Sequence, residues 1–277
     1  MKSKGVKFTK KAFQSRPRRF SVIWMLPNFL TICALIFGLQ AMYQALFNNW
    51  DSVIIMIIIA SVFDMLDGRV ARLLKSTSEF GMHLDSLSDF VVFGAVPAFA
   101  VYLWMGKPQG NLFWIVIVLY VICSALRLAR FNSELSERPS YAKNYFTGVP
   151  TPAAAFLMLF PIAIDGYLES QNLKSFEIIG LWIGLISIVM VSNLPTFSGK
   201  VFQIPKSYVI PMLIILALLS NAIISNPIKG FIILVLVYIL SLPFASLFYW
   251  RLKKKAEALN LKSCLLYTSP SPRDSGK

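Results

Sequence analysis

Residues 64–89 of this chain read DMLDGRVARLLKSTSEFGMHLDSLSD and place four carboxylates at the ends of two long apolar segments. These carboxylates belong to Asp64, Asp67, Asp85 and Asp89. An ionised side chain at membrane depth costs about 3 kcal/mol or more, so such residues are usually functional. Four like charges at helical spacing would also repel one another unless a cation lies between them. This stretch therefore predicts a metal site.

The rest of the sequence is that of a polytopic membrane protein. Of its 277 residues, 56% are hydrophobic and only 14% are charged, and the mean hydropathy is +0.64. A soluble domain has about 25% charged residues. Stretches of about 20 apolar residues, the length that crosses a hydrocarbon core, recur along nearly the whole chain. They predict an all-α membrane protein with about eight transmembrane helices, at 26–47, 52–74, 86–106, 112–132, 150–168, 177–195, 207–226 and 228–250.

Lysines and arginines alternate between successive connections and predict the orientation of the chain. Twenty-four of them lie in 1–20, 69–75, 127–143, 200–206 and after 250, whereas the other connections contain three. By the positive-inside rule, both termini and the aspartates face the cytoplasm, and we expect the chain in the inner membrane. Anionic lipid head groups are the expected partners of these basic rims. The net charge of +14 therefore does not indicate nucleic acid.

The short connections leave no room for a soluble domain. We expect a basic cytoplasmic arm over 1–20, a transmembrane domain that carries the aspartates over 21–252, and a disordered cytoplasmic tail over 253–277. Within the tail, the Ser/Pro-rich residues 263–277 are expected to be an artefact and not part of the fold. Three cysteines without motif spacing predict no disulfide framework.

Helical geometry brings the carboxylates together. At 100° per residue, four residues lie within about 80° of Asp64 on one helix face: Asp67, Gly68, Ala71 and Arg72. On the following helix, Asp85 and Asp89 lie about 40° apart. The short connection makes the two helices antiparallel neighbours, so both pairs of carboxylates can converge.

This residue pattern favours chemistry at phosphorus. Converging carboxylates suit hard divalent cations, and we expect two ions of Mg²⁺ or Mn²⁺. Two such ions beside Arg72, whose charge is permanent, suit displacement at a phosphoryl group. The small Gly68 and Ala71 would let a bulky ligand approach the backbone closely. Salt bridges that hold helices together, or an ion pathway, are the competing interpretations of the aspartates.

The complete motif resembles the signature of the CDP-alcohol phosphotransferase family. The eight matching positions are Asp64, Asp67, Gly68, Ala71, Arg72, Gly81, Asp85 and Asp89. Within this family, the chain is similar to the bacterial phosphatidylserine synthases in the stretches 26–31, 89–97, 125–132 and 146–153. The resemblance covers the chain from about residue 20 to residue 250. It implies the helical core of the family and transfer of the phosphatidyl group of CDP-diacylglycerol to L-serine, giving phosphatidylserine and CMP.

The resemblance also implies roles for individual residues. Asp64, Asp67 and Asp85 would bind metal, and Asp89 would face the metals and act as the base for the acceptor hydroxyl. Contacts with the CDP-lipid are implied at Asn28, Thr31, Gly68, Ala71, Arg72, Ser78 and Gly81. For the acceptor serine we expect Arg130 and Asn132, since both lie in a stretch that resembles the subfamily. Family members are commonly homodimers, and we expect the same here.

Two alternatives to this function stay open. The same chemistry could use glycerol-3-phosphate, inositol phosphate or choline as the acceptor. A phosphorylated acceptor would need a denser basic pocket than Arg127, Arg130 and Lys143 provide. A metal-coupled transporter would instead show inverted repeats or charges at mid-membrane depth, whereas these aspartates gather on one side.

Overall fold

The computed structural model describes residues 25–74, 76, 78–106, 111–134, 145–168, 174–192, 195–197, 214, 221 and 225–243. Several predictions concern residues outside this set: the arm 1–20, the tail 253–277 and nearly all of the seventh predicted span, 207–226. Apart from turns and connections, the described part is helical except for two strands of three residues each. The predicted all-α membrane fold is confirmed in this part of the chain.

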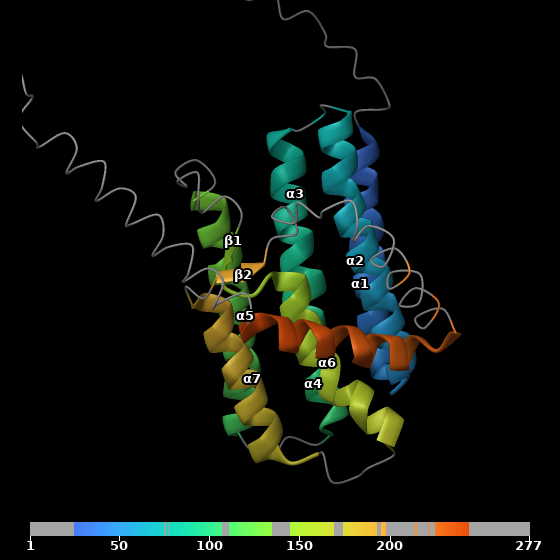
Figure 1. Cartoon of the computed structure of the whole chain (residues 1–277), viewed down its shortest axis with the longest axis vertical. Coiled ribbons are helices and arrows are strands. Elements are labelled where there is room, and N and C mark those ends of the chain that lie inside the picture. Colours follow the sequence, from blue (N-terminus) through green and yellow to red (C-terminus); the bar gives the residue numbers. More distant parts are fainter. Residues whose placement is uncertain are drawn as a thin grey trace, which may run out of the picture.

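Three adjacent helices begin the fold and carry the motif. α1 (Leu26–Leu46), α2 (Trp50–Leu73) and α3 (Glu79–Asp89) run side by side, and a π-helical segment, η2 (Phe90–Ala95), continues α3 into α4 (Val96–Trp104). The start of α1, the end of α2 and the start of α3 lie at the same end of the bundle, at the top of Figure 1. α2 and α3 are therefore antiparallel, as their short connection predicts.

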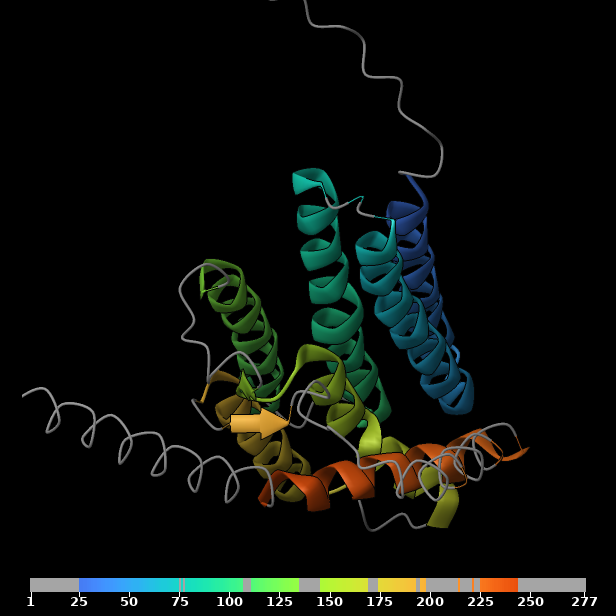
Figure 2. The same cartoon turned by 45° about the horizontal axis from the view of Figure 1, so that its top comes forward.

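Two of the remaining helices, α5 (Asn111–Glu134) and α6 (Thr151–Leu168), pack against α4 and η2. The next helix, α7 (Phe176–Val191), packs against α5 and α6. A further apolar helix, Pro227–Pro243, lies across the direction of α1, α2 and α3 in both views (Figure 2). It overlaps the eighth predicted span, 228–250.

The two strands were not predicted from the sequence. β1 (Tyr145–Thr147) and β2 (Pro195–Phe197) form an antiparallel pair in which Phe146 lies opposite Thr196. The residue after β1, Gly148, has a φ of +75°, and a Cβ there would lie 2.4 Å from the Met190 carbonyl oxygen. Only glycine therefore fits where the chain turns from β1 past the end of α7.

Helix length and composition support a membrane protein. In the described part of the chain, four helices are long and apolar enough to cross a membrane: Leu26–Leu46, Glu79–Trp104, Asn111–Ser133 and Thr151–Leu168. α2 has 24 residues, which is sufficient length, but the charged side chains of the motif lower its apolar character. With these charges, α2 is not one of the four.

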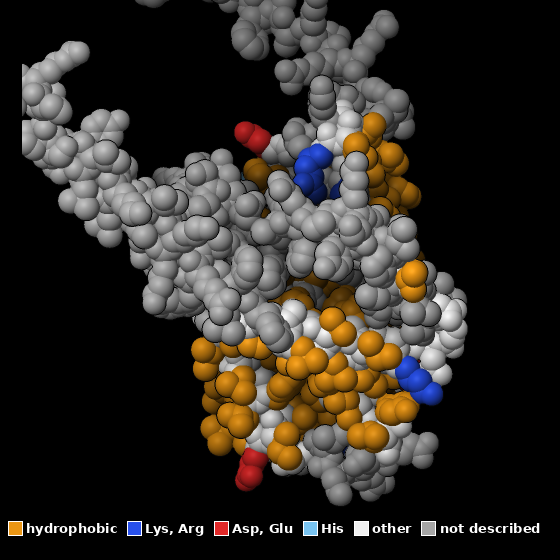
Figure 3. Space-filling model, in the orientation of Figure 1, with side chains coloured by type: hydrophobic (Ala, Val, Ile, Leu, Met, Phe, Trp, Pro, Cys, Tyr) orange, Lys and Arg blue, Asp and Glu red, His pale blue; other side chains and the backbone are white. Residues whose placement is uncertain are grey.

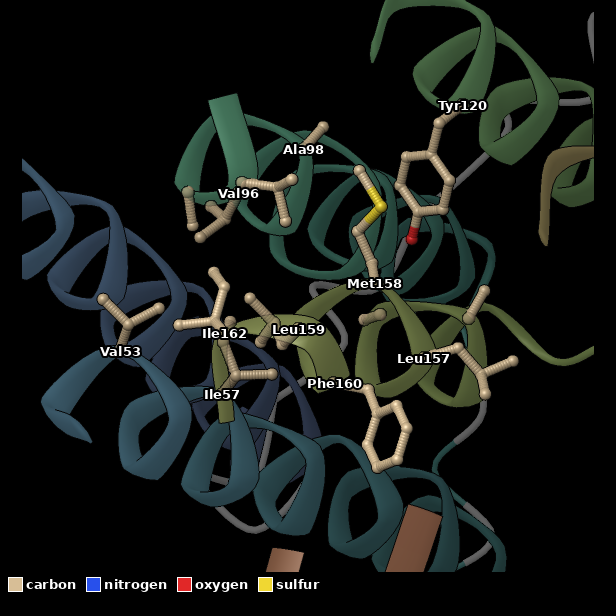
Figure 4. Close-up of a cluster of buried hydrophobic side chains, with 14 of the residues drawn as sticks. Val53, Ile57, Val96, Ala98, Tyr120, Leu157, Met158, Leu159, Phe160 and Ile162 are labelled. Carbon is tan, nitrogen blue, oxygen red and sulfur yellow. The ribbon is translucent and has the colours of Figure 1, made fainter. Parts of the chain in front are cut away.

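Apolar side chains fill the interior and also cover much of the surface. Figure 4 shows side chains from four helices meeting in one core, with Val53 and Ile57 from α2, Val96 from α4, Tyr120 from α5 and Met158 from α6. On the outside, Figure 3 shows hydrophobic side chains over most of the lower face. Large exposed apolar side chains are expected where helices face lipid tails rather than water.

The π-helical segment directly follows the last aspartate of the motif. Pro97 has no N–H group, so the Phe93 carbonyl lacks the donor that would close an α-helical turn. The buried hydroxyl of Tyr120 on α5 donates a hydrogen bond of 2.9 Å to this carbonyl. A side chain from a neighbouring helix thus replaces the missing backbone donor.

Candidate active site

The aspartates of the motif converge as the sequence predicts. One carboxylate oxygen from each of Asp64, Asp67 and Asp85 lies within 4.8 Å of the others. The carboxyl group of Asp89 is within hydrogen-bonding reach of Asp64 and lies close enough to Asp67 and Asp85 for electrostatic repulsion. The four carboxylates therefore form one cluster, contributed by α2 and α3.

Local sequence explains why α3 begins where it does. Ser78 adopts an extended conformation and accepts a hydrogen bond of 3.0 Å from the Gly81 N–H, which makes it the N-cap of α3. The helix begins seven residues before the predicted span 86–106, so Asp85 lies in its second turn. The cap thereby fixes the turn of α3 that presents Asp85 to α2.

α1 supplies a polar contact to the cluster from outside the motif. The Thr31 hydroxyl donates a hydrogen bond of 2.6 Å to Oδ2 of Asp67. Asp67 is the most buried of the four aspartates, with only 4% of its surface exposed. A buried carboxylate needs such a donor, because an unpaired buried charge is strongly unfavourable. The sequence did not reveal this contact.

A cavity of about 590 Å³ opens beside the carboxylates. It is lined by residues of α1, α2, α3 and the α2–α3 connection: Pro27, Asn28, Thr31, Asp67, Gly68, Ala71, Arg72, Ser76, Ser78, Glu79, Gly81, Met82 and Asp85. All seven positions for which the sequence predicts contact with a CDP-lipid are in this set. The structure thus brings them together around one space, next to two of the aspartates.

The two glycines of the motif differ in what surrounds them. A Cβ on Gly68 would meet no atom of the described residues within 4 Å, so protein packing does not require glycine at this position. A Cβ on Gly81 would lie 2.8 Å from Asn28 Oδ1 and 3.1 Å from Ser78 Oγ. Gly81 therefore permits the close packing of α1 against the start of α3, whereas Gly68 leaves open space in the cavity.

Arg72 is the basic residue of the cavity wall. Its Nε donates a hydrogen bond of 2.9 Å to the Gly68 carbonyl, one turn earlier in α2. This bond uses one of the five N–H groups of the guanidinium and orients the others. The side chain is exposed and can pair with phosphate oxygens in the cavity.

Some residues of the cavity wall were not predicted from the sequence. Ser76 is the most informative of them: it is 4% exposed, and its hydroxyl has no hydrogen-bond partner among the described residues. Its backbone N–H donates a hydrogen bond of 3.0 Å to the Ala71 carbonyl. The only signal in the sequence was its position in the connection between two motif helices, and that signal does not distinguish it from its neighbours.

The residues predicted to bind the acceptor lie elsewhere. Neither Arg130 nor Asn132 lines the cavity. Arg130 donates to the Val191 carbonyl at the end of α7 at 3.4 Å. Asn132 donates to Ser86 Oγ at 3.0 Å, and Ser86 lies on α3 between two of the aspartates in sequence. Asn132 thus reaches the motif helix, while contact of either residue with serine stays a prediction.

The donor set fits hard divalent cations. Three carboxylates that meet within 4.8 Å offer only oxygen ligands, which Mg²⁺ and Mn²⁺ prefer. Among the described residues, no lysine or arginine forms a salt bridge with these carboxylates. Bound cations would instead offset the mutual repulsion of the carboxylates.

Comparisons with known proteins agree with this arrangement. The family described as CDP-alcohol phosphatidyltransferase matches residues 24–191. A Mycobacterium tuberculosis (strain ATCC 25618 / H37Rv) protein named CDP-diacylglycerol--serine O-phosphatidyltransferase is 33% identical over 234 residues, covering 83% of this chain and 81% of that protein. A Helicobacter pylori (strain J99 / ATCC 700824) protein of the same name is 35% identical over 175 residues, or 62% of this chain and 71% of that protein.

Proposed function

The chain belongs to the CDP-alcohol phosphatidyltransferase family, and from this premise we propose that it transfers the phosphatidyl group of CDP-diacylglycerol to the hydroxyl of L-serine. The products would be phosphatidylserine and CMP. The observation that carries the proposal is the cavity beside the aspartates, since every predicted CDP-lipid position lines it. The M. tuberculosis and H. pylori relatives are named as serine O-phosphatidyltransferases, which supports serine as the acceptor.

The aspartates would hold the divalent cations of the reaction. We propose Asp64, Asp67 and Asp85 as ligands, with Asp89 also facing the ions, because their carboxylates form one cluster. Two ions of Mg²⁺ or Mn²⁺ are our expectation for this set. When bound, such ions neutralise the charge that develops on the diphosphate and on the departing CMP.

The other cavity residues would bind and orient the lipid nucleotide. Arg72 offers N–H donors to phosphate oxygens, while Gly68 and Ala71 leave room along the backbone of α2. Asn28 and Ser78 add polar groups from the facing elements. With the phosphates held near the carboxylates, the acyl chains can remain in the bilayer.

Asp89 would act as the general base. Serine's hydroxyl oxygen forms the new bond to the phosphatidyl phosphorus, and its proton passes to the Asp89 carboxylate. The bond from that phosphorus to the oxygen of CMP breaks, and CMP leaves with the bonding electron pair. A positioned base contributes about 10²- to 10⁴-fold to such a step. No covalent intermediate with the protein is required.

Acceptor binding, assembly and membrane orientation complete the proposal. Arg130 and Asn132 would contact serine, and the hydrogen bond from Asn132 to Ser86 supports a place for Asn132 near α3. The basic connections support insertion in the inner membrane with the site and both termini in the cytoplasm. We propose a homodimer in which residues 21–252 form the catalytic domain.

Acceptor-dependent release of CMP tests the function. The purified full chain, in micelles with CDP-diacylglycerol and Mn²⁺ or Mg²⁺, is given serine, glycerol-3-phosphate, inositol phosphate or choline in separate reactions. We expect release only with serine, and phosphatidylserine as the product by mass spectrometry. Release that needs a different acceptor, or that does not depend on serine, would overturn the assignment.

A substitution tests the proposed base. Asp89→Asn should lower kcat by about 10²- to 10⁴-fold. Asp51→Asn is the matched control, because Asp51 is an exposed aspartate at the opposite end of α2, and we expect it to keep full activity. Full activity of Asp89→Asn would contradict the role of this residue.

A further inference from the structure

Thr31 of α1 contacts both helices that carry the aspartates. Its hydroxyl donates to Asp67 Oδ2 on α2 at 2.6 Å, and its backbone carbonyl accepts a hydrogen bond of 3.4 Å from Ser88 Oγ on α3. Thr31, Asp67 and Ser88 are 5%, 4% and 4% exposed, so both hydrogen bonds are shielded from solvent. One residue of α1 thus joins the three helices around the carboxylate cluster.

The hydroxyl proton of Thr31 is directed at Asp67. The Thr31 oxygen also lies 3.1 Å from the Pro27 carbonyl, one turn earlier in α1. A hydroxyl has a single proton, and the shorter contact, 2.6 Å, has the length of a charge-assisted O–H···O⁻ bond. Threonine in a helix divides between two χ1 rotamers, and the contacts with Asp67 and the Pro27 carbonyl hold Thr31 in one of them. The donor is therefore held in place before any ligand arrives.

We propose that Thr31 is a positioning residue that orients the Asp67 carboxylate toward Asp64 and Asp85. The inference rests on the function proposed above, because it concerns how the cluster holds divalent cations. Donation to Oδ2 restricts rotation of the carboxylate and leaves lone pairs on both oxygens for a cation. Residues that orient metal ligands in this way typically change metal affinity by about 10- to 100-fold when they are removed.

This role differs from the direct CDP-lipid contact that the resemblance implies for Thr31. Thr31 does line the cavity, but its only proton is engaged by Asp67 rather than offered to a ligand. A contact residue would chiefly affect the KM for CDP-diacylglycerol. A positioning residue would chiefly affect the concentration of divalent cation that the protein needs.

The test measures Mn²⁺ binding directly and does not depend on turnover. Free Mn²⁺ is quantified by electron paramagnetic resonance in titrations of the full chain in micelles, without substrate. Thr31→Val removes the hydroxyl without loss of volume and Thr31→Ala removes it with loss of volume, so failure of one variant to fold leaves the other. Thr31→Ser restores the hydroxyl. Ser187→Ala is the control, since the described residues give this buried hydroxyl a single hydrogen bond, to the Ile183 carbonyl of its own helix.

We expect Thr31→Val and Thr31→Ala to raise the dissociation constant for Mn²⁺ by about 10-fold or more, and saturating Mn²⁺ to restore most of kcat. Thr31→Ser and the Ser187→Ala control should stay within about 3-fold of the unchanged chain. Unchanged Mn²⁺ affinity in both hydroxyl-free variants would overturn the proposed role of Thr31 but not the metal site. An equal loss of Mn²⁺ affinity in Thr31→Ser would do the same. If the unchanged chain binds no Mn²⁺, the proposed metal site fails, and the role of Thr31 fails with it.

Discussion

Replacing Gly68 by alanine should weaken substrate binding without weakening the fold. The new Cβ would project into the cavity, where no described atom lies within 4 Å. In a helix interior, alanine is favoured over glycine by about 0.8–1 kcal/mol. No contact of the new Cβ offsets this gain. The free energy of unfolding should therefore stay constant or rise by up to about 1 kcal/mol.

The bound lipid nucleotide should meet the added methyl group. An extra carbon in a well-packed contact costs about 1–3 kcal/mol, and about 1.4 kcal/mol corresponds to a tenfold change in affinity. We therefore expect the KM for CDP-diacylglycerol to rise by about 5- to 140-fold. The KM for serine should change little, because the proposed base Asp89 and the proposed serine contacts Arg130 and Asn132 do not line the cavity.

Two measurements on the same micelle preparation check this expectation. CMP release at varied CDP-diacylglycerol gives the KM, and thermal unfolding gives the stability. Gly184→Ala in α7 is the matched control, because its Cβ also meets no described atom within 4 Å, and Gly184 does not line the cavity. An unchanged KM in Gly68→Ala would refute the placement of substrate in the cavity. A marked drop in unfolding temperature would show that the space is not open.

Three further substitutions probe neighbouring parts of the structure. Gly81→Ala should lower the free energy of unfolding by about 1–3 kcal/mol in denaturation experiments, because its Cβ would lie 2.8 Å from Asn28 Oδ1. Tyr120→Phe should cost about 1–3 kcal/mol in the same assay, since the buried Phe93 carbonyl loses its donor. Ser76→Ala should raise the KM for CDP-diacylglycerol by about 2- to 13-fold but leave stability unchanged, because no described residue bonds to this hydroxyl. Loss of stability with unchanged KM would contradict this.

The convergence of the aspartates was predictable because it depends on local geometry. A three- or four-residue spacing fixes which helix face Asp64, Asp67, Asp85 and Asp89 occupy, and a short connection makes adjacent helices antiparallel. The cluster observed in the structure is the consequence of these two facts. Likewise, apolar length is sufficient to locate the helices to within a few residues in most of the predicted spans.

Features that depend on a partner from another helix were not predictable. Within a helix, Pro97 leaves the Phe93 carbonyl four residues earlier without a donor, but that Tyr120 would supply one depends on how α5 packs against η2. The strand pair β1–β2 joins segments about fifty residues apart, each too short to show a two-residue periodicity. The exact start of α3 depends on the Ser78 cap, which a hydropathy pattern does not detect.

The dependence of the site on α1 follows from the same reasoning. The motif specifies carboxylates on two helices, but two helices alone leave Asp67 with one face unsupported. α1 covers that face, donates to the carboxylate from Thr31 and places Asn28 against Gly81. These contacts join residues 36 and more positions apart, so no spacing within the motif could specify them. The chemistry of the motif in residues 64–89 therefore depends on α1. Variants of α1 should alter metal and nucleotide binding although they leave the motif unchanged.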